Sequence, residues 1–417
     1  MLTQAFYTGL AGVRSNQFAI DVTSDNLANI STTGFRGSEY EFASLFEDAI
    51  NTSHSLNSST VGIGSRIQAT ALKEAQGSLE LTDRSTDLAI LGNGWFGTQG
   101  ANDPIYTRDG AFTFDANSDL VSQDGAYVLG TIGGNISDDD TLTEIIDEVP
   151  LGNVGTQEKL RFPSTLTYPP VASTTASFIG NIGTTDDLRT MSAGVIDPEN
   201  NRNNLELIFT KATNQVPPGI QWDVIAKTKS LDEQTTYDTQ EGFVEFDSQG
   251  SLLSSTFTTI DNNGVDVTID LGTGFNGVLS NNTAISASSS ANGTIGGDLV
   301  GYSINKNADV LATFSNGFQS SVGKIAVYHF QNDQGLERIN GSKFQESSNS
   351  GRPLFYKDSD NQNIIGVDIA NFKLEGSNID MTYGITELII LQRSFDANSK
   401  SITTADQMMQ KALNMDA

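Results

Sequence analysis

The sequence predicts a mainly β protein whose two ends are α-helices that pair with each other. Three observations point to this fold class. Apolar residues recur in alternating steps of four and three at both ends of the chain, which is the period of paired helices. Asn-Gly and Asp-Gly pairs separate short apolar runs in the middle, as they do in antiparallel sheets. Glycine takes 40 of the 417 positions, so turns must be frequent.

We call the apolar stripe at each end of the chain a seam. The two seams predict an antiparallel pair of helices that forms a coiled-coil core layer. One helix cannot bury such a stripe alone, whereas two helices brought together from distant ends of the chain can. A single amphipathic helix more often lies on a globular core, but matching seams at both termini favour pairing. Residues 1–30 and 380–417 are therefore expected to be a terminal helical assembly domain. Its predicted self-assembly core consists of Phe6, Leu10, Val13, Ile20, Leu27, Leu388, Leu391, Phe395, Ile402 and Met409.

Residues 31–75 are predicted to be an extended connector. The first helical pattern ends near Asn29, and Gly34 tolerates the left-handed backbone angles that stop a helix. From residue 42 to about residue 73 the sequence is polar, and Ser and Asn are concentrated in 51–60. Such a segment buries little apolar surface, so we expect it to be poorly stabilised by itself.

Residues 76–163 and 298–379 are predicted to form one discontinuous β-domain, because the paired termini force the chain to return to where it left. Three turn pairs favour tight hairpin turns between antiparallel strands. They are Asn93-Gly94, Asp109-Gly110 and Asp124-Gly125. The apolar run 325–330 has the composition of a buried strand.

Residues 164–297 are predicted to form an inserted outer antiparallel β-domain. Two sets of apolar residues alternate with polar ones, as on half-buried strands. The sets are Ile220, Trp222, Val224 and Ala226, and then Val265, Val267, Ile269 and Leu271. Prolines near residue 163 and the Ser-rich run 286–290 mark the limits of this insertion.

Composition argues against several classes of function. A formal net charge of −28 disfavours an electrostatic grip on nucleic acid or on an anionic membrane. The chain has no Cys, which excludes disulfides, thiolate zinc sites and a Cys nucleophile. No stretch reaches the roughly eighteen consecutive apolar residues that span a bilayer. Residues 1–10 lack Lys and Arg, and no long apolar run follows them, so no cleavable signal peptide is expected.

The residues that carry catalysis or bind metals in other proteins form no specific pattern here. His54 lies in a polar segment and His329 in a strand pattern, where a solvated or packed role fits better than a general base. Residues 115–119 have the spacing of calcium ligands, but Leu120 replaces the turn glycine and Ala126 the bidentate Glu. A catalytic pair of carboxylates stays open, although nothing selects two of them. No catalytic residue, metal site or cofactor is therefore predicted.

A distinctive motif follows the first helical pattern, over residues 26–36, and its residues include Asn26, Ala28, Asn29, Thr33, Gly34 and Phe35. This motif resembles the N-terminal signature of the bacterial flagellar rod and hook proteins. Further segments are similar to family motifs and follow in the family's order. They are 76–79, 86–90, 94–96, 106–112, 374–380 and 392–395.

Hook members of this family resemble the chain in size and in having a second inserted β-domain, and segments 296–304 and 323–336 are also hook-like. The resemblance implies a structural subunit, not an enzyme, that self-assembles into the flexible helical tube of the flagellar hook and transmits motor torque to the filament. It implies export by the flagellar type III apparatus to the extracellular hook. The implied partners are further copies of the chain, the distal rod protein, the hook cap and the hook–filament junction proteins, without nucleic acid or membrane insertion.

Three alternatives stay open from the sequence. The ending 399–411 also resembles the distal rod protein of the basal body, and segment 47–60 is longer than in compact hook proteins. A secreted β-rich adhesin or carbohydrate-binding protein, or a β-rich hydrolase, could use the same middle region. The curvature of a polymer, glycan binding by a monomer, and turnover that one carboxylate substitution abolishes distinguish these alternatives.

Overall fold

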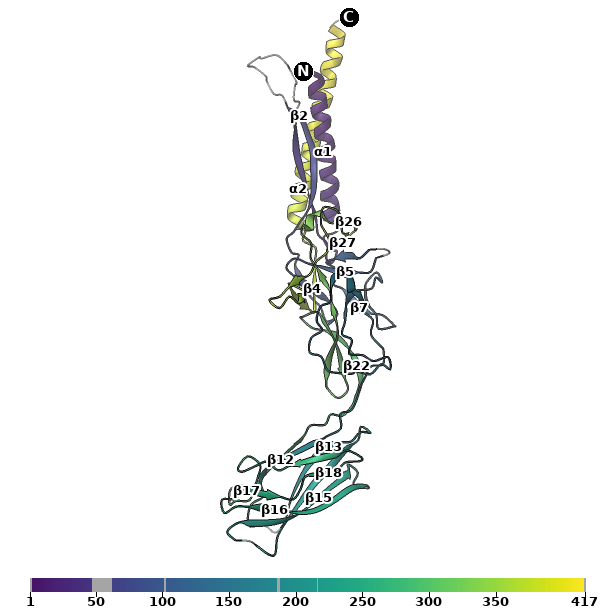
Figure 1. The fold of residues 1–417 in the computed structure, drawn as a ribbon. Helices are drawn as coiled ribbons and strands as arrows, with labels where there is room; N and C mark the ends of the chain where they lie inside the picture. The colour runs from purple at the N-terminus through teal and green to yellow at the C-terminus, as the bar shows by residue number, and fades with distance from the viewer. Residues whose placement is uncertain (1, 47–61, 101–102, 186–187, 216, 416–417) are drawn as a thin grey trace.

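The computed structural model describes residues 2–46, 62–100, 103–185, 188–215 and 217–415. The molecule is elongated, with a pair of helices at one end, a β-rich body in the middle and a separate β-sandwich at the other end (Figure 1). This arrangement confirms the mainly β fold class with a helix at each terminus.

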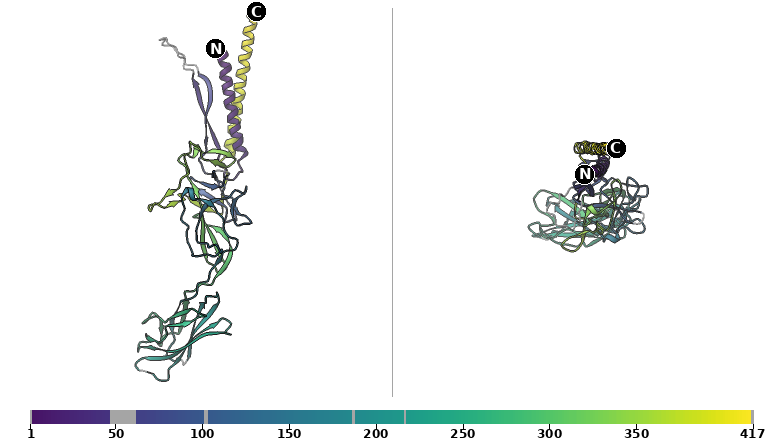
Figure 2. Two further views of the ribbon diagram at one scale, coloured as in Figure 1. Left: turned by 45° about the vertical axis from the view of Figure 1, so that its right-hand side comes forward. Right: turned by 90° about the horizontal axis from the view of Figure 1, so that it is seen from above.

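The two helices run side by side, and both chain ends lie at the same tip of the molecule (Figure 2). They are α1 (Leu2–Ala28) and α2 (Met381–Met415). Two glycines on α1 allow a close approach: a Cβ atom added to Gly12 would lie 2.7 Å from the Asn398 side chain, and one added to Gly9 would lie 2.9 Å from Ile402. At the start of α2, the Asp380 carboxylate accepts the Tyr383 N–H at 2.8 Å, as an N-cap does. The predicted antiparallel helical pair is present.

Strands β1 (Ser38–Phe46) and β2 (Gly62–Leu72) form a long antiparallel hairpin beside α1. The Ser15 hydroxyl donates to the Ser65 carbonyl at 3.0 Å, and a Cβ on Gly64 would lie 2.8 Å from the Ala11 Cβ. The prediction of an extended connector over 31–75 therefore missed a β-hairpin, because its strands are stabilised by a helix from elsewhere and not by a core of their own. The polar run 51–60 lies outside the described residues.

The body combines strands from before and after the outer domain. Its first strands are β3 (Leu79–Leu81), β4 (Leu88–Leu91), β5 (Trp95–Thr98), β6 (Ile105–Thr107), β7 (Phe112–Phe114), β8 (Leu120–Ser122), β9 (Leu129–Ile132), β10 (Glu158–Lys159) and β11 (Thr167–Tyr168). Its later strands are β22 (Gly297–Ile304), β23 (Asp309–Phe314), β24 (Gln319–Ile325), β25 (Val327–Tyr328), β26 (Glu337–Asn340), β27 (Lys343–Gln345), β28 (Tyr356–Lys357), β29 (Asn363–Ile364), β30 (Asp368–Asn371) and β31 (Lys373–Glu375). Short 3-10 turns occur at Val154–Thr156 and Asp333–Gly335.

Two larger sheets organise the body, in the orders β10-β9-β24-β23-β22-β11 and β25-β5-β6-β27-β26. Both sheets contain strands from each side of the outer domain. The predicted single buried strand over 325–330 is wrong in one respect: the run is buried, but it passes from β24 in one sheet to β25 in the other. Its apolar side chains thereby contribute to two adjoining clusters of the core.

Only one of the three predicted hairpin turns closes a hairpin. At Asp124-Gly125, the Ser122 N–H donates to the Ala126 carbonyl at 2.9 Å. The other two turn pairs join strands that pair with different partners. Gly110 packs so tightly that an added Cβ would lie 1.9 Å from the Leu88 carbonyl oxygen. Glycine is therefore needed at this position because two distant segments approach closely. An Asp-Gly pair in the sequence does not by itself distinguish such an approach from a hairpin turn.

The outer domain is a sandwich of two five-stranded sheets around its own apolar core. Its strands are β12 (Thr175–Asn181), β13 (Leu188–Ile196), β14 (Arg202–Lys211), β15 (Ile220–Ser230), β16 (Thr236–Phe246), β17 (Leu252–Ser255), β18 (Thr259–Asp261), β19 (Asp266–Asp270), β20 (Val278–Leu279) and β21 (Ser286–Ala291). The two predicted half-buried strands are confirmed as β15 and β19. The sandwich is not wholly antiparallel, because β12 pairs in parallel with β19 and β20.

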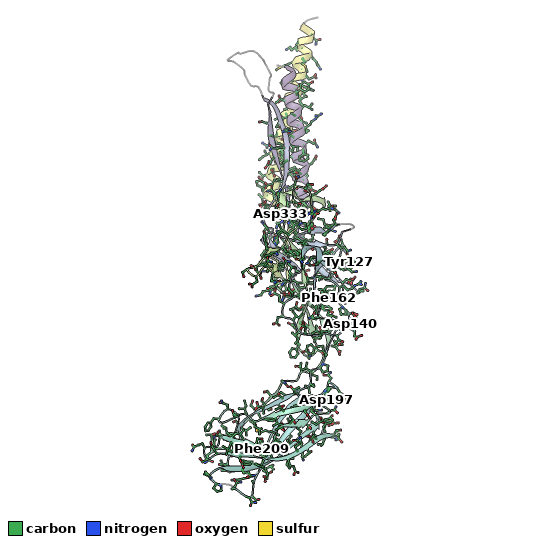
Figure 3. The ribbon with its side chains drawn as sticks, in the orientation of Figure 1. Tyr127, Asp140, Phe162, Asp197, Phe209 and Asp333 are labelled. Carbon is green, nitrogen blue, oxygen red and sulfur yellow. The ribbon has the colours of Figure 1, made fainter. Side chains whose placement is uncertain are left out.

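A narrow link joins the outer domain to the body (Figure 1). Val171 and Thr294 exchange two backbone hydrogen bonds of 2.8 Å across this link. In Figure 3, Phe162 lies in the body, Phe209 lies within the sandwich, and Asp197 lies at the end of the sandwich nearest the link. The chain thus enters and leaves the outer domain at adjacent points.

Candidate functional site

The residues predicted to form a self-assembly core lie along the contact between α1 and α2 of one chain. Leu391 is only 5% exposed, and the other nine are half-buried. Ile402 faces Gly9, and the Leu27 side chain lies 3.7 Å from the position of a Cβ on Gly384. These residues therefore close the helical hairpin within a single chain. Their role in contacts between copies stays a prediction.

The signature residues at the end of α1 stop the helix and start the hairpin. The Asn26 side chain donates to the Ser38 carbonyl at 2.7 Å and accepts the Ser38 N–H at 2.9 Å, which imitates the pairing of a neighbouring strand. The Asn29 amide donates to the Asp25 carbonyl at 2.9 Å, and Thr32 donates to the Asn29 side-chain oxygen at 3.2 Å. Ala28 is exposed and Thr33 is half-buried.

Gly34 and Phe35 pack closely against the body. Gly34 has a φ of +65°, and an added Cβ would lie 2.3 Å from the Asp109 nitrogen, so only glycine fits. Its N–H donates to the Glu375 carbonyl at 2.6 Å. Phe35 is fully buried, and the Arg338 guanidinium lies 4.8 Å from the centre of its ring, within cation–π range.

A buried cluster of three charged side chains joins the N-terminal segment, the body and the C-terminal segment. Glu375 pairs with Arg36 at 2.8 Å and with Arg108 at 3.4 Å, and each of the three side chains is at most 3% exposed. Arg36 also donates to the carbonyls of Glu74 and Ala75, so its charge has several acceptors.

Burial lowers the pKa of both guanidinium groups. The pKa of Arg108 falls to about 10, because of burial first and the neighbouring Arg36 charge second. The pKa of Arg36 is lowered by burial, against the attraction of Glu375. Both groups stay protonated at neutral pH, so one carboxylate holds two buried cations.

Asn378 completes the connection just before α2. Its amide donates to the carbonyls of Lys73 (3.0 Å) and Ala75 (2.8 Å), and its oxygen accepts the Gly37 N–H at 2.8 Å. We call this set of contacts the joint, and its residues are Asn26, Gly34, Phe35, Arg36, Arg108, Glu375 and Asn378. The joint fixes the helical pair to the body through side chains as well as through the two chain crossings.

Sequence reasoning identified the motifs that contain the joint but not the charged cluster. Arg36, Arg108 and Glu375 each stand inside a recognised motif, yet their pairing depends on segments more than two hundred residues apart. One feature of the sequence could have indicated the cluster: each of the three motifs has a charged residue close to a glycine or an aromatic residue.

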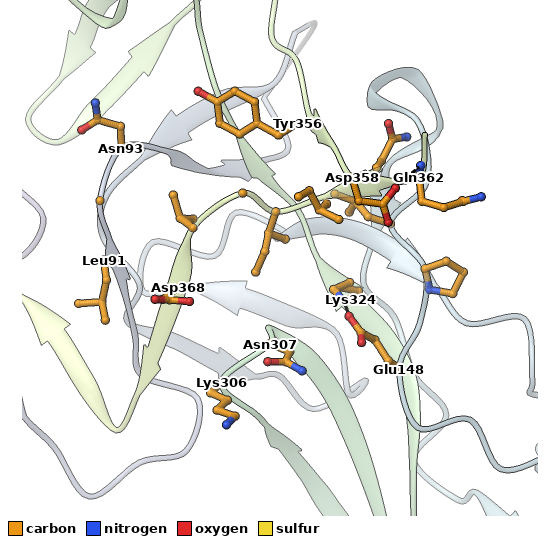
Figure 4. A pocket seen from close by; sticks show the side chains of 18 residues that line it. Leu91, Asn93, Glu148, Lys306, Asn307, Lys324, Tyr356, Asp358, Gln362 and Asp368 are labelled. Carbon is orange, nitrogen blue, oxygen red and sulfur yellow. Dashed lines mark hydrogen bonds and ion pairs between the residues drawn. The ribbon is translucent and has the colours of Figure 1, made fainter. Parts of the chain in front are cut away.

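An open groove of about 1090 Å³ lies on the flank of the body, beside β28 and β29 (Figure 4). Three carboxylates line this groove, Glu148, Asp358 and Asp368, and the first two hold neighbouring groups of the chain. Glu148 pairs with Lys324, and Asp358 accepts the backbone N–H groups of Asp360 (2.9 Å) and Gln362 (2.8 Å). These two carboxylates hold the local chain in place, which gives the hydrolase hypothesis no support here.

His329 has a packed role. It is buried, its Nε2 lies 2.7 Å from the Ile365 carbonyl, and its ring centre lies 4.3 Å from that of Tyr356. Burial lowers the pKa of its imidazole, so this ring is neutral at pH 7. His54 lies outside the described residues.

The calcium-like segment 115–119 uses its carboxylates for structure. Asp115 accepts the N–H groups of Asn117 at 2.8 Å and Asp119 at 2.9 Å, and Asp119 makes a two-point pair with Arg161. Among the residues that the structure describes, no group of three or more His, Asp or Glu side chains is placed to hold a metal ion. Within the same residues, neither helix has the length and apolar character needed to cross a membrane.

Three flagellar protein families match successive segments of the chain. They are "Flagella basal body rod protein" over residues 6–36, "Flagellar hook protein FlgE/F/G D1 domain" over 89–149, and "Flagellar basal body rod FlgEFG protein C-terminal" over 372–415. Each matched segment supplies one member of the charged cluster: Arg36, Arg108 and Glu375. The chain belongs to the flagellar rod and hook protein family.

Flagellar hook proteins from other bacteria align with the chain along almost its whole length. The flagellar hook protein FlgE of Borreliella burgdorferi is 26% identical over 99% of this chain and 100% of that protein. The flagellar hook protein FlgE of Escherichia coli is 26% identical, with the same coverage of both chains. A crystal structure of Helicobacter pylori flagellar hook protein FlgE2 aligns with a TM-score of 0.50 at 18% identity, over 71% of this chain and 100% of that one. The structural likeness concerns the fold.

Proposed function

We propose that this chain is the structural subunit of a bacterial flagellar hook, and that copies of it self-assemble into a flexible helical tube. The observation that carries this proposal is the full-length similarity to flagellar hook proteins, combined with the elongated shape of the molecule (Figure 1). In the tube, the helical pair would form the inner layer, and the body and outer domain would lie at larger radius.

The geometry suits the transmission of torque. The joint ties both helices to the body through buried charges, so a force on the body passes to the inner layer without loosening the connection. Head-to-tail contacts that do not close on themselves grow as a helical tube. Polar contacts between outer domains can shift without breaking a dry core, which would let a curved tube bend as it rotates.

The proposed partners follow from this position in the flagellum. Copies of the chain would contact each other along the tube, the distal rod protein would meet one end, and the hook cap or the hook–filament junction proteins would meet the other. The flagellar type III apparatus would export the chain to the outside of the cell. The predicted self-assembly core would stabilise the inner layer by keeping each helical hairpin closed.

Electron microscopy of the purified chain in polymerising salt tests this proposal. The comparison variant lacks residues 1–29 and 380–417, and Trp95 fluorescence in a Trp222→Phe background reports whether its body stays folded. We expect curved tubes from the full chain and a folded monomer from the trimmed one. Straight, stiff tubes would favour the distal rod protein instead. A full chain that stays monomeric and binds a glycan would favour the adhesin, and turnover that one carboxylate substitution abolishes would favour the hydrolase.

A further inference from the structure

We propose that the hairpin formed by β28 and β29 is an acid-sensitive lid, which the neutral His329 side chain holds closed and which opens when that imidazole takes up a proton. The hairpin covers residues 356–364, and we call it the lid. It forms one wall of the groove on the flank of the body (Figure 4). The inference concerns a single chain, so it does not depend on the proposed function.

The lid has almost no core of its own. Every residue in it except Asn363 is exposed. Its strands pair at only two positions, Tyr356 with Ile364 and Lys357 with Asn363. An isolated two-stranded hairpin is marginally stable at best in water, so contacts with the body must keep the lid in place.

His329 makes the buried contacts at the base of the lid. Its backbone exchanges two hydrogen bonds with Leu354, of 3.1 and 2.9 Å, just before the lid begins. Its Nε2 lies 2.7 Å from the carbonyl of Ile365, just after the lid ends. Because a carbonyl only accepts, this nitrogen carries the ring hydrogen. The centre of the imidazole also lies 4.3 Å from the centre of the Tyr356 ring. One side chain therefore contacts both ends of the lid.

The remaining contacts of the lid with the body are polar and lie near its surface. The Asn363 amide donates to the Gly152 carbonyl at 3.0 Å and to the Asn153 side-chain oxygen at 3.2 Å, and water can replace both acceptors. Phe355 is buried against Tyr328 immediately before the lid. When the lid opens, this aromatic contact keeps the chain anchored to the body.

The closed lid leaves little room for a second proton on the imidazole. His329 is only 3% exposed, so water cannot solvate a charged ring. The free nitrogen, Nδ1, lies on the side of Gly94, where an added Cβ atom would be 3.6 Å from it and 3.2 Å from Cε1. Burying a charge in such a site is unfavourable unless a partner compensates it.

The groups around the ring do not supply enough compensation. Burial is the largest effect, and it lowers the pKa of His329. The hydrogen bond to the Ile365 carbonyl, the charge of Asp333 on the nearby 3-10 turn and the backbone of Asn93 each raise the pKa by less, and the Arg108 charge lowers it further. The phenol ring that packs on the imidazole from β28 carries no formal charge. The closed lid therefore favours the neutral imidazole.

Opening exposes the imidazole to water and returns its pKa to the ordinary value of about 6.5. Above that pH, both the closed and the open form hold a neutral ring, and the closed form keeps its full advantage. Below it, the open form binds a proton that the closed form excludes, so acid favours opening. Between pH 7.5 and pH 5.5 the ratio of open to closed chains should rise about fivefold to tenfold.

Hydrogen exchange of residues 352–367 at pH 7.5 and pH 5.5, corrected for the intrinsic effect of pH on exchange, measures this ratio. We expect the stated rise in the unaltered chain, and a change below twofold in the outer domain. In His329→Phe the aromatic packing on Tyr356 is kept but nothing titrates, so opening of the lid should differ by less than twofold between the two pH values. A rise of the same size in both chains, or no rise in the unaltered chain, would overturn the proposal.

A second measurement leaves His329 in place and decides the question even if His329→Phe does not fold. The chain has two His residues, so the variant His54→Gln contains one imidazole, whose Cε1–H signal is followed by NMR as the pH is lowered. We expect a midpoint below 6.5. A midpoint at or above 6.5 would show that protonation does not favour opening. Trp95 fluorescence in a Trp222→Phe background checks that the body stays folded at pH 5.5.

Discussion

Glu375 is the residue on which the connection between helices and body depends most. Its side chain is almost completely buried and faces two guanidinium groups from distant parts of the chain. Its backbone carbonyl accepts the Gly34 N–H, so the same residue also anchors the signature segment. Removing one partner from a buried ion pair is costly, because it leaves the other charge buried and uncompensated.

The change Glu375→Gln is expected to destabilise the body by about 3–5 kcal/mol, since two buried cations lose their shared anion. Urea unfolding measures this free energy. Trp95 fluorescence in a Trp222→Phe background reports on the body alone, because the chain has only these two tryptophans, one in the body and one in the outer domain.

The matched control for this prediction is Glu80→Gln. Glu80 is exposed on β3, the strand that pairs with β31, which contains Glu375. Its change is expected to shift stability by no more than about 0.5 kcal/mol. Equal effects of the two variants would mean that the buried cluster contributes nothing specific to the joint.

At the scale of elements, the sequence predicts the helices and strands whose apolar residues recur with the period of their own buried face. The seams of α1 and α2 and the alternation in β15 and β19 follow directly from which side chains each element buries. The β1–β2 hairpin could not be predicted in this way, because it packs on α1 through small side chains such as Ala11 and Ser15. The charged cluster of the joint was missed for a related reason: its members are close only after the sheets of the body bring them together.

The β1–β2 hairpin should separate from α1 in the variant Gly64→Ala. Gly64 has a φ of +117°, and the new methyl group would lie 2.8 Å from the Ala11 Cβ. The backbone strain alone costs about 1–3 kcal/mol for a non-glycine residue. Hydrogen exchange of β1, β2 and the facing part of α1 should become faster, while exchange in the outer domain should not change.

Thr70→Ala is the control for the hairpin, because Thr70 is exposed on the same strand. Its exchange rates should match those of the unaltered chain. If Gly64→Ala leaves the hairpin as protected as before, the close contact with Ala11 does not hold the hairpin in place.

At the scale of the whole molecule, charge is distributed unevenly along the long axis. The helical pair is nearly neutral, so almost the whole net charge of −28 lies on the connector, the body and the outer domain. Copies that associate through their helices must therefore bring acidic bodies close together. Such repulsion between exposed charges is screened by salt over a Debye length of about 10 Å at 0.1 M.

Assembly should therefore become more favourable as salt is raised from about 0.01 M to about 0.3 M, since the Debye length falls from about 30 Å to below 10 Å over that range. Light scattering gives the critical concentration at each salt concentration, and it should fall. The double variant Asp138→Asn, Asp139→Asn removes two exposed charges from the body and should show a weaker salt dependence. A critical concentration that rises with salt would indicate attraction between charged surfaces instead.

The narrow link between body and outer domain has a consequence for engineering. Val171 and Thr294 hydrogen-bond to each other where the chain departs and returns, and the sandwich beyond them has a core of its own. A guest protein with closely spaced ends could take the place of the sandwich without changing any strand pairing in the body. In a tube built from such subunits, every copy would carry its guest at the outer surface. The link is therefore a suitable position for joining guest proteins that are to be displayed at regular intervals.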